Sequence, residues 1–500
     1  MFSTRVSTRL MMAASALLLS ACASSIAYIP PQETVSTQWS VLTQSNTNNA
    51  AHVQVQDAAS NETWWTIFHD PQLDRLVRQG LLKNHDLAAA SAAADAADFD
   101  AGVARSALFP RVDGSASIGR TRAGPAKSDL DTVSRIGAQG SFDIDPAGGN
   151  RRRQEAALAE SDAARAERDR VRSELIADIA LNYIRLISAK RQLAITQMNL
   201  DDQQKNLRIT TGQRAQGAVS DLEVSRAKAQ VEATSARIPQ LQTQVTTFMN
   251  QLGVLTGVQP GTLNTLLQIQ RTIPDVPQNI VVSTPISTIR QRPDIRETER
   301  RLARDTALHE AAIAAMYPSL SLSAFYGKGD SLNAGNFTPW NIAAGSLMPL
   351  IDFGRIRNQI NAADARKQEA FHNYQQAVLR GLADVENNMA AYINERTREQ
   401  SLSASAVHEG DAAHIAGAQY TAGTTGQIDL LLAQENKLEA DLALAQSQQA
   451  LAEDLVHVFQ SLGWGALAQA PLVIDGPRAP DEVVTEKFAK IGRMQPIVDR

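Results

Sequence analysis

Few residues of this 500-residue chain are arranged for covalent chemistry. His69 stands beside Asp70, a pair that could act as a general base and its orienting carboxylate, but no serine or cysteine nucleophile motif accompanies it. Asp70 precedes Pro71 and is better suited to capping a helix. The sequence has no Gly-rich phosphate loop, and its eight histidines are scattered, without metal-ligand spacing. We therefore expect no enzyme, no cofactor and no metal site.

The single cysteine, Cys22, has an informative setting. Two arginines precede an apolar run at residues 10–19, which is too short to span a bilayer, and Leu19-Ser-Ala leads directly to Cys22. This arrangement resembles the lipobox of bacterial lipoproteins, in which the signal at residues 1–21 is removed and the thiol is acylated. Ala23 after the cysteine favours the outer over the inner membrane. The alternative is an ordinary signal peptide with a chance cysteine.

A long helical hairpin at residues 352–463 organises the second half of the chain. It breaks once, at Tyr420 to Gly426, and its first arm carries apolar residues three, four or seven apart, at Phe371, Val378, Leu382, Val385, Met389 and Tyr392. This spacing predicts a coiled-coil seam rather than the broader stripe of a globular helix. An arm of about 60 residues would be about 90 Å long.

The hairpin has a twin at residues 145–253, because landmarks recur at a nearly constant offset. Pro110 and Pro318 are 208 residues apart, and Gly217 and Gly423 are 206 apart. Such an offset indicates an internal duplication. We expect a signal peptide at 1–21, a lipid-anchored extended linker at 22–63, a first repeat at 64–256, a connector at 257–284, a second repeat at 285–465 and a C-terminal tail at 466–500.

Each repeat also contains two weakly alternating stretches, which we interpret as β-strands at about 112–119, 136–144, 320–326 and 342–350. Four strands cannot close a barrel, for which about eight are needed. Three chains would supply twelve. The predicted fold is therefore mainly α with a β-barrel part: a trimeric tube with a 12-stranded membrane β-barrel and a long α-helical barrel.

Several stretches resemble the outer-membrane factors of the TolC superfamily, in their lipoprotein branch (OprM-like or NodT-like). Arg292-Pro-Asp-Ile-Arg296 matches the most specific signature of that family, Ile351-Asp-Phe-Gly354 matches its strand exit, and Tyr420-Thr-Ala-Gly423 matches its periplasmic turn. The likeness covers about residues 60–465. One departure is His309-Glu310, where the family usually has Ile-Gly.

The resemblance implies a homotrimeric channel in the outer membrane of a Gram-negative bacterium, with a helical tunnel across the periplasm. It would pair with a periplasmic adaptor and an inner-membrane pump of the resistance-nodulation-division type, and export small molecules. The net charge of −5 gives no reason to expect nucleic-acid binding. The alternative is a lipid-anchored coiled-coil adaptor or tether without a pore.

Candidate site residues follow from the same resemblance. The tunnel constriction transfers onto Ile428, Asp429, Leu432 and Glu435, where three-fold symmetry would turn Asp429 into a ring of carboxylates that attracts cations. Many relatives have Asp at the position of Leu432. The alternative is that Asp429 caps its helix or faces solvent.

Two further groups of residues are candidates for a functional role. A hydrogen bond from Tyr420 to Glu223 could latch the hairpins, although Thr425 stands where some relatives have Arg, and plain turn structure is the alternative. The signature residues Arg292, Pro293, Asp294 and Arg296 resemble a charged catalytic cluster, but we interpret them as structural, at a helix start.

Overall fold

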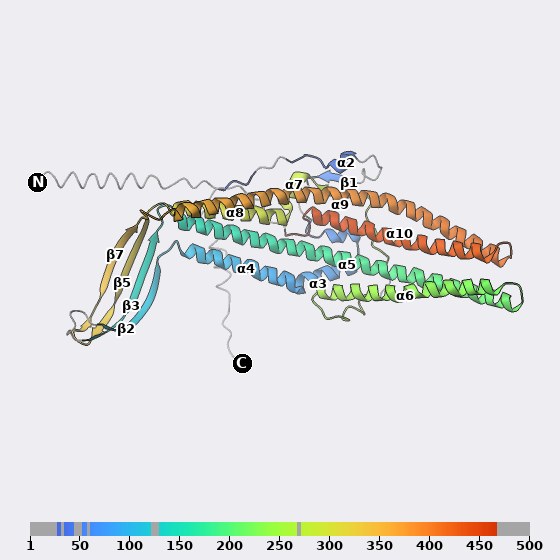
Figure 1. The fold of residues 1–500 in the computed structure, drawn as a ribbon, viewed down its shortest axis with the longest axis horizontal. Coiled ribbons are helices and arrows are strands. Elements are labelled where there is room, and N and C mark those ends of the chain that lie inside the picture. The colour runs from blue at the N-terminus through green and yellow to red at the C-terminus, as the bar shows by residue number, and fades with distance from the viewer. Residues whose placement is uncertain are drawn as a thin grey trace.

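The structure of the protein is a computed structural model. The structure describes residues 28–31, 35–44, 53–57, 61–121, 130–267 and 272–467. The molecule is a long rod, with a β-sheet at one end and two helical hairpin tips at the other (Figure 1). Cys22 and the tail beyond residue 467 lie outside the described residues.

The helices form two matching sets, which confirms the duplication. The first set is α4 (His85–Ser106), α5 (Gly149–Ala215) and α6 (Asp221–Leu255). The second set is α8 (Pro293–Ala314), α9 (Arg355–Thr421) and α10 (Gln427–Ser461). The helices of each set have 22, 67 and 35 residues. At 1.5 Å per residue, α5 and α9 are each about 100 Å long.

Shorter elements surround the middle of the rod. They are α2 (Ser40–Gln44), the 3-10 helix η2 (Trp64–Phe68), α3 (Pro71–Lys83), α7 (Pro285–Gln291), and the parallel strand pair β1 (Val53–Gln56) and β4 (Ile280–Ser283). Asp70 caps α3 as expected, accepting hydrogen bonds from the backbone N–H groups of Gln72 and Leu73. Among the described residues, none of the helices combines the length and hydropathy needed to cross a membrane.

Matching aspartates also start the two longest helices. Asp145 accepts hydrogen bonds from the backbone N–H groups of Gly149 and Asn150, at 2.8 and 2.6 Å. Asp352 accepts equivalent bonds from Gly354 and Ile356, at 3.0 and 2.9 Å. These carboxylates satisfy N–H groups that have no partner within the helix. The long helices therefore leave the sheet at the same point of each repeat.

The sheet is antiparallel throughout. Its strands are β2 (Arg111–Thr121), β3 (Asp131–Ile144), β5 (Ser319–Ser331), β6 (Gly335–Phe337) and β7 (Trp340–Leu347), in the order β2-β3-β5, with β6 and β7 both paired to β5. Three of the expected strands extend further away from the helices than predicted, since polar residues there continue the ladder. The fourth ends at Leu347 and does not reach residue 350.

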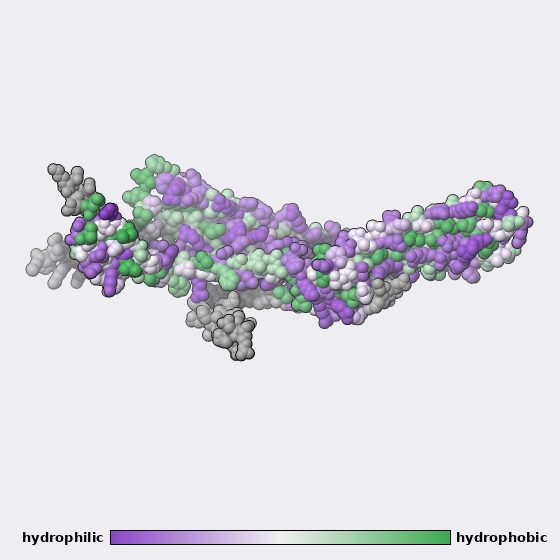
Figure 2. Space-filling view, turned by 90° about the horizontal axis from the view of Figure 1, so that it is seen from below, coloured by the Kyte–Doolittle hydropathy of each residue, from purple (hydrophilic) through white to green (hydrophobic). Residues whose placement is uncertain are grey.

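The pairing register gives the sheet an apolar face and a polar face. Val112, Ile136, Leu322 and Ile342 share a face because their paired positions alternate in step. The other face carries mainly small or polar residues, including Ser117, Arg135, Gln139, Ser321 and Asn341. It also carries Phe325 and Phe337, whose rings lie against glycines. Figure 2 shows hydrophobic side chains gathered on the sheet end and along the hairpins.

The seam along α5 changes character along its length. Near the middle of the rod it buries Ile176, Ile179, Ile184 and Leu186 in the main apolar core. Further toward the tip, Leu193, Leu200 and Leu207 are spaced seven residues apart but are only half-buried. The buried positions there include Ile195, Thr196, Asn199, Gln203 and Thr210, most of which are polar. A nearly straight helix of 3.6 residues per turn drifts away from a seven-residue repeat, and this rotation brings polar side chains into the seam.

The segments expected to be linkers are more ordered than predicted. Within 22–63, Trp39 is fully buried and its indole Nε1–H donates to the carbonyl of Ser283 at 2.8 Å. Within 257–284, Leu263 and Leu267 join the main core. Parts of both segments therefore pack against the helices. Isolated apolar residues in a polar stretch carry no periodicity, and only the fold shows where they pack.

Candidate functional site: the hairpin tips

The start of α10 places the predicted constriction residues at the free end of the rod. Ile428 and Leu432 are one turn apart and 51% and 58% exposed. Asp429 lies beside them, also exposed, and its Oδ2 accepts a hydrogen bond from the Thr425 hydroxyl at 2.8 Å. The carboxylate of Asp429 is in the first helical turn and open to solvent, and the bond described for it is to the Thr425 hydroxyl rather than to a backbone N–H.

Glu435 is on the same side of α10 but its carboxylate is engaged. It accepts a short hydrogen bond from the Gln230 amide and pairs with Arg237 at 3.2 Å. Arg237 also pairs with Glu439 at 2.7 Å. Since Gln230 and Arg237 belong to α6, Glu435 ties the second hairpin to the first. Glu435 therefore differs from the three exposed constriction residues, because its carboxylate is already paired within the chain.

Tyr420 does not bond to Glu223 within the chain. Its hydroxyl donates to Gln213 Oε1 at 3.0 Å and lies 3.2 Å from Thr210 Oγ1, both on α5. The carboxylate of Glu223 is used instead in a capping box with Ser220. Within the chain, the Tyr420 hydroxyl therefore bonds to α5 rather than to Glu223, and the latch stays a prediction.

A neutral polar network joins all four helices at the tips. Gln427 of α10 donates through Nε2 to the Glu223 carbonyl at 2.9 Å and to Thr210 Oγ1 at 3.4 Å. We call Thr210, Gln213, Tyr420 and Gln427 the tip network. Sequence reasoning missed three of its members. Polar residues at positions where the hairpin seam calls for apolar ones are the signal that could have found them.

The signature residues lie far from the tips and contact neighbouring helices. The Arg292 guanidinium is almost completely buried and pairs with Asp294 at 2.7 Å and with Asp384 of α9 at 3.2 Å. It also donates to the carbonyl of Ser461, at the end of α10, at 2.8 Å. Pro293 is the first residue of α8. Arg292 thereby joins the start of α8 to both arms of the second hairpin.

Arg296 and the unusual pair His309-Glu310 also serve helix contacts. Arg296 donates to the Arg290 carbonyl at 3.3 Å, and burial lowers the pKa of its guanidinium. Glu310 pairs with Arg152 of α5 at 2.7 Å. His309 Nε2 lies 3.8 Å from Asp364 of α9. Because His309-Glu310 stands where the family usually has Ile-Gly, α8 makes one polar contact with α5 and one with α9.

Comparison with known proteins agrees with this architecture. The family model "Outer membrane efflux protein" matches residues 76–258 and 285–464, one block for each repeat. Nodulation protein T of Rhizobium leguminosarum bv. trifolii is 27% identical over 91% of this chain and 97% of its own length. The pyoverdine export outer membrane protein OpmQ of Pseudomonas aeruginosa is 27% identical over 90% of this chain and 95% of its own.

Solved structures show the same fold. The outer-membrane channel OprN superimposes with a TM-score of 0.78 and 29% identity, covering 87% of this chain and 98% of its own. The CmeC outer membrane channel of Campylobacter jejuni gives a TM-score of 0.81 at 22% identity, covering 94% and 98%.

Proposed function

The chain belongs to the outer membrane efflux protein family and is an outer-membrane efflux channel, and from its geometry we propose how it assembles and where it is gated. The observation that carries the proposal is the joining of a two-faced sheet to two hairpins about 100 Å long. An apolar outer face suits lipid, a polar inner face suits water, and long hairpins suit a tunnel. A channel performs no covalent chemistry, because pore width and charge decide what passes.

The assembly we propose is a homotrimer. In one chain, β2 and β7 each leave an edge of the sheet unpaired. Unpaired edges are unfavourable in lipid, where no water can satisfy the backbone groups. Pairing β2 of one protomer with β7 of the next would close a 12-stranded barrel and continue the helices as a ring. A pore-less adaptor or tether does not need such a sheet, and the names of the relatives also favour the channel.

The gate we propose is the exposed face of α10 at the tip. Three-fold symmetry would repeat Ile428, Asp429 and Leu432 around the axis, with the carboxylates forming the charged ring. The tip network holds the start of α10 against the first hairpin, through Gln427. Its members are neutral, so each hydrogen bond contributes only about 1 kcal/mol. Opening the tunnel would exchange these bonds for bonds to water.

The remaining parts of the proposal concern partners and anchoring. Efflux by a passive channel requires an energy source elsewhere, which a periplasmic adaptor and an inner-membrane pump of the resistance-nodulation-division type would supply. Acylated Cys22 would add a lipid anchor at the outer membrane.

The experiment is single-channel recording of the purified protein in planar bilayers, paired with its mass in detergent. We expect a trimer, and a closed or weakly conducting wild-type pore with cation preference. Asp429→Asn should lower the ratio of cation to anion permeability. Glu223→Gln is the matched control, because the duplication aligns Glu223 with Asp429 and glutamine keeps the capping geometry. A monomer would refute the tube. Equal permeability ratios in wild type and Asp429→Asn would refute the gate assignment.

A further inference from the structure

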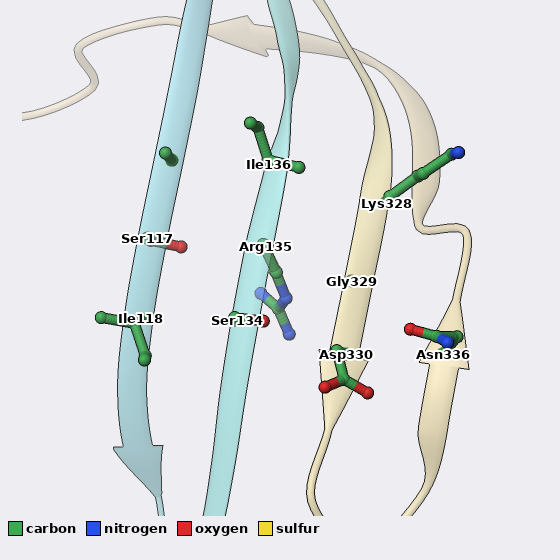
Figure 3. Close-up of a pocket in the computed structure, with 10 residues that line it drawn as sticks. Ser117, Ile118, Ser134, Arg135, Ile136, Lys328, Gly329, Asp330 and Asn336 are labelled. Carbon is green, nitrogen blue, oxygen red and sulfur yellow. The ribbon is translucent and has the colours of Figure 1, made fainter.

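A hollow lies on the sheet at the end away from the helices, with a volume of about 450 Å³. Ten residues of β2, β3, β5 and β6 line it. Seven of them lie on the apolar face, including Ala116, Ile118, Ile136 and Lys328, and Ser117, Arg135 and Gly329 belong to the other face. Figure 3 shows Ile118, Ile136 and Lys328 on three neighbouring strands. Ala116 faces Ile136 in the register, and Ile136 faces Lys328. Small side chains such as Ala116 and Ser134 lie between the larger Ile118 and Ile136, and the space above the small ones forms the hollow.

The hollow belongs to the apolar face of the sheet. Ile136 and Lys328 share that face with the paired aromatic residues Tyr326 and Trp340, one register step nearer the helices. On the opposite face the same level is filled, because the ring of Phe337 packs on Gly329. The hollow is therefore open toward the outside of the proposed barrel, where lipid lies.

The position of the aromatic pair fixes the depth of the hollow. Tyr326 and Trp340 are 69% and 70% exposed, as expected for a belt at the membrane surface. From Leu320 to Tyr326 the apolar face spans about 20 Å. Lys328 lies about 7 Å beyond Tyr326, at the level where lipid headgroups begin.

The charges around the hollow favour an anionic headgroup. Among the described residues, no carboxylate lies within salt-bridge distance of the Lys328 ammonium, although Asp330 stands on the same face. Arg120 is exposed on that face two register steps beyond Ala116 on β2, and its Nε donates only to the Thr132 hydroxyl, at 3.2 Å. A cation above an apolar floor of Ile118 and Ile136 is complementary to a phosphate attached to acyl chains.

We propose that this hollow is a binding site for a phosphate-bearing lipid of the outer leaflet. The acyl chains lie on Ile118 and Ile136, and Lys328 binds the phosphate. Arg120 adds positive charge at the outer rim. The site is separate from the tunnel and from the gate, so it orders the lipid around the channel without touching the transported molecule.

The chain carries its own reporter for this site. Of its five tryptophans, Trp39, Trp64, Trp65 and Trp464 are buried and Trp340 alone is exposed. Lipids brominated on their acyl chains quench only nearby indoles, so quenching reports the lipid next to Trp340. The full-length trimer is reconstituted in vesicles that mix unbrominated phosphatidylcholine with either brominated phosphatidylglycerol or brominated phosphatidylcholine.

We expect phosphatidylglycerol to be preferred over phosphatidylcholine next to Trp340 by about three- to tenfold, as one charge-assisted contact predicts. Lys328→Gln should abolish this preference. Arg78→Gln is the control for the loss of one positive charge, since Arg78 is exposed on α3, away from the sheet. Conductance should be the same in both variants, which separates this proposal from the gate.

Three results would overturn the proposal. The first is an equal affinity of the wild type for the two lipids. The second is a preference that survives Lys328→Gln, or that Arg78→Gln abolishes equally, because either would mean a general effect of charge. The third is competition by millimolar inorganic phosphate in the buffer, which would show a site for free phosphate rather than for lipid.

Discussion

Replacing Arg292 by lysine tests whether this guanidinium holds the second hairpin together. Arg292 donates to two carboxylates and to the carbonyls of Ser461 and Gly381, at 2.8 and 3.4 Å. Lysine keeps the positive charge but lacks the planar fork that reaches carboxylate and carbonyl together. Gly463, with φ of 78°, packs directly against Arg292 and leaves little room for rearrangement.

The cost follows from the groups left without a partner. The Ser461 carbonyl at the end of α10 would lose its donor, which costs about 1–3 kcal/mol, whereas the Gly381 carbonyl keeps its partner within α9. Weaker pairing with Asp294 and Asp384, which are partly exposed and can recover water, adds about 1 kcal/mol. Arg292→Lys should therefore cost about 2–4 kcal/mol. The effect should be local to the junction of α8, α9 and α10.

Hydrogen–deuterium exchange measures such local opening directly. Amides near residues 290–296 and 461–465 should exchange from about 30-fold to several hundred-fold faster in Arg292→Lys. Arg78→Lys is the control, because the Arg78–Asp74 pair is exposed and its loss should change exchange little. Equal exchange in Arg292→Lys and wild type would refute the reasoning, and so would faster exchange spread evenly over the chain.

Three further predictions follow. Burial and two neighbouring carboxylates raise the pKa of Asp454 to about 6, so its cost to stability is absent below about pH 4 and grows up to pH 6. Denaturant unfolding should show that Asp454→Asn raises the free energy of unfolding at pH 7.5 by about 1 kcal/mol, allowing for solvent screening, but not at pH 4. Glu453→Gln is the control. It breaks the ion pair with Arg185 and should not raise the free energy of unfolding at pH 7.5. Gly257→Ala should cost about 2–4 kcal/mol, since φ is +67° and the new Cβ meets a backbone carbonyl of α3, and Gly261→Ala, at φ +87° in open space, should cost less. Cys22→Ser should abolish labelling by radioactive palmitate while the trimer still forms, and labelling that persists would disprove the lipobox.

Periodicity and duplication predicted the helices well, because they depend on many residues at once. The near-constant offset between repeats anticipated two sets of helices, which the structure shows with equal lengths. Strand ends were less predictable. At the outer end of β3, Asp131 and Thr132 continue the ladder without any apolar alternation to announce it.

Side-chain partners at the tips could not be predicted from spacing alone. Whether Tyr420 meets Glu223 or Gln213 depends on how far α9 is rotated about its axis, and a drift of about 20° per heptad accumulates along 67 residues. Trp39 is a similar case, since its burial depends on β1 pairing with β4 more than 220 residues away.

The change of the α5 seam from apolar to polar gives the rod a gradient of stiffness. Near the middle of the rod, separating the hairpins would expose Ile179 and Leu186 to water, which is unfavourable over every square ångström exposed. Near the tip, Asn199 and Thr210 exchange one hydrogen-bonding partner for another, and water can take the place of either. A force applied to the free end should therefore separate the helices near the tips more easily than those near the middle of the rod. The tips can then move without a matching movement of the sheet.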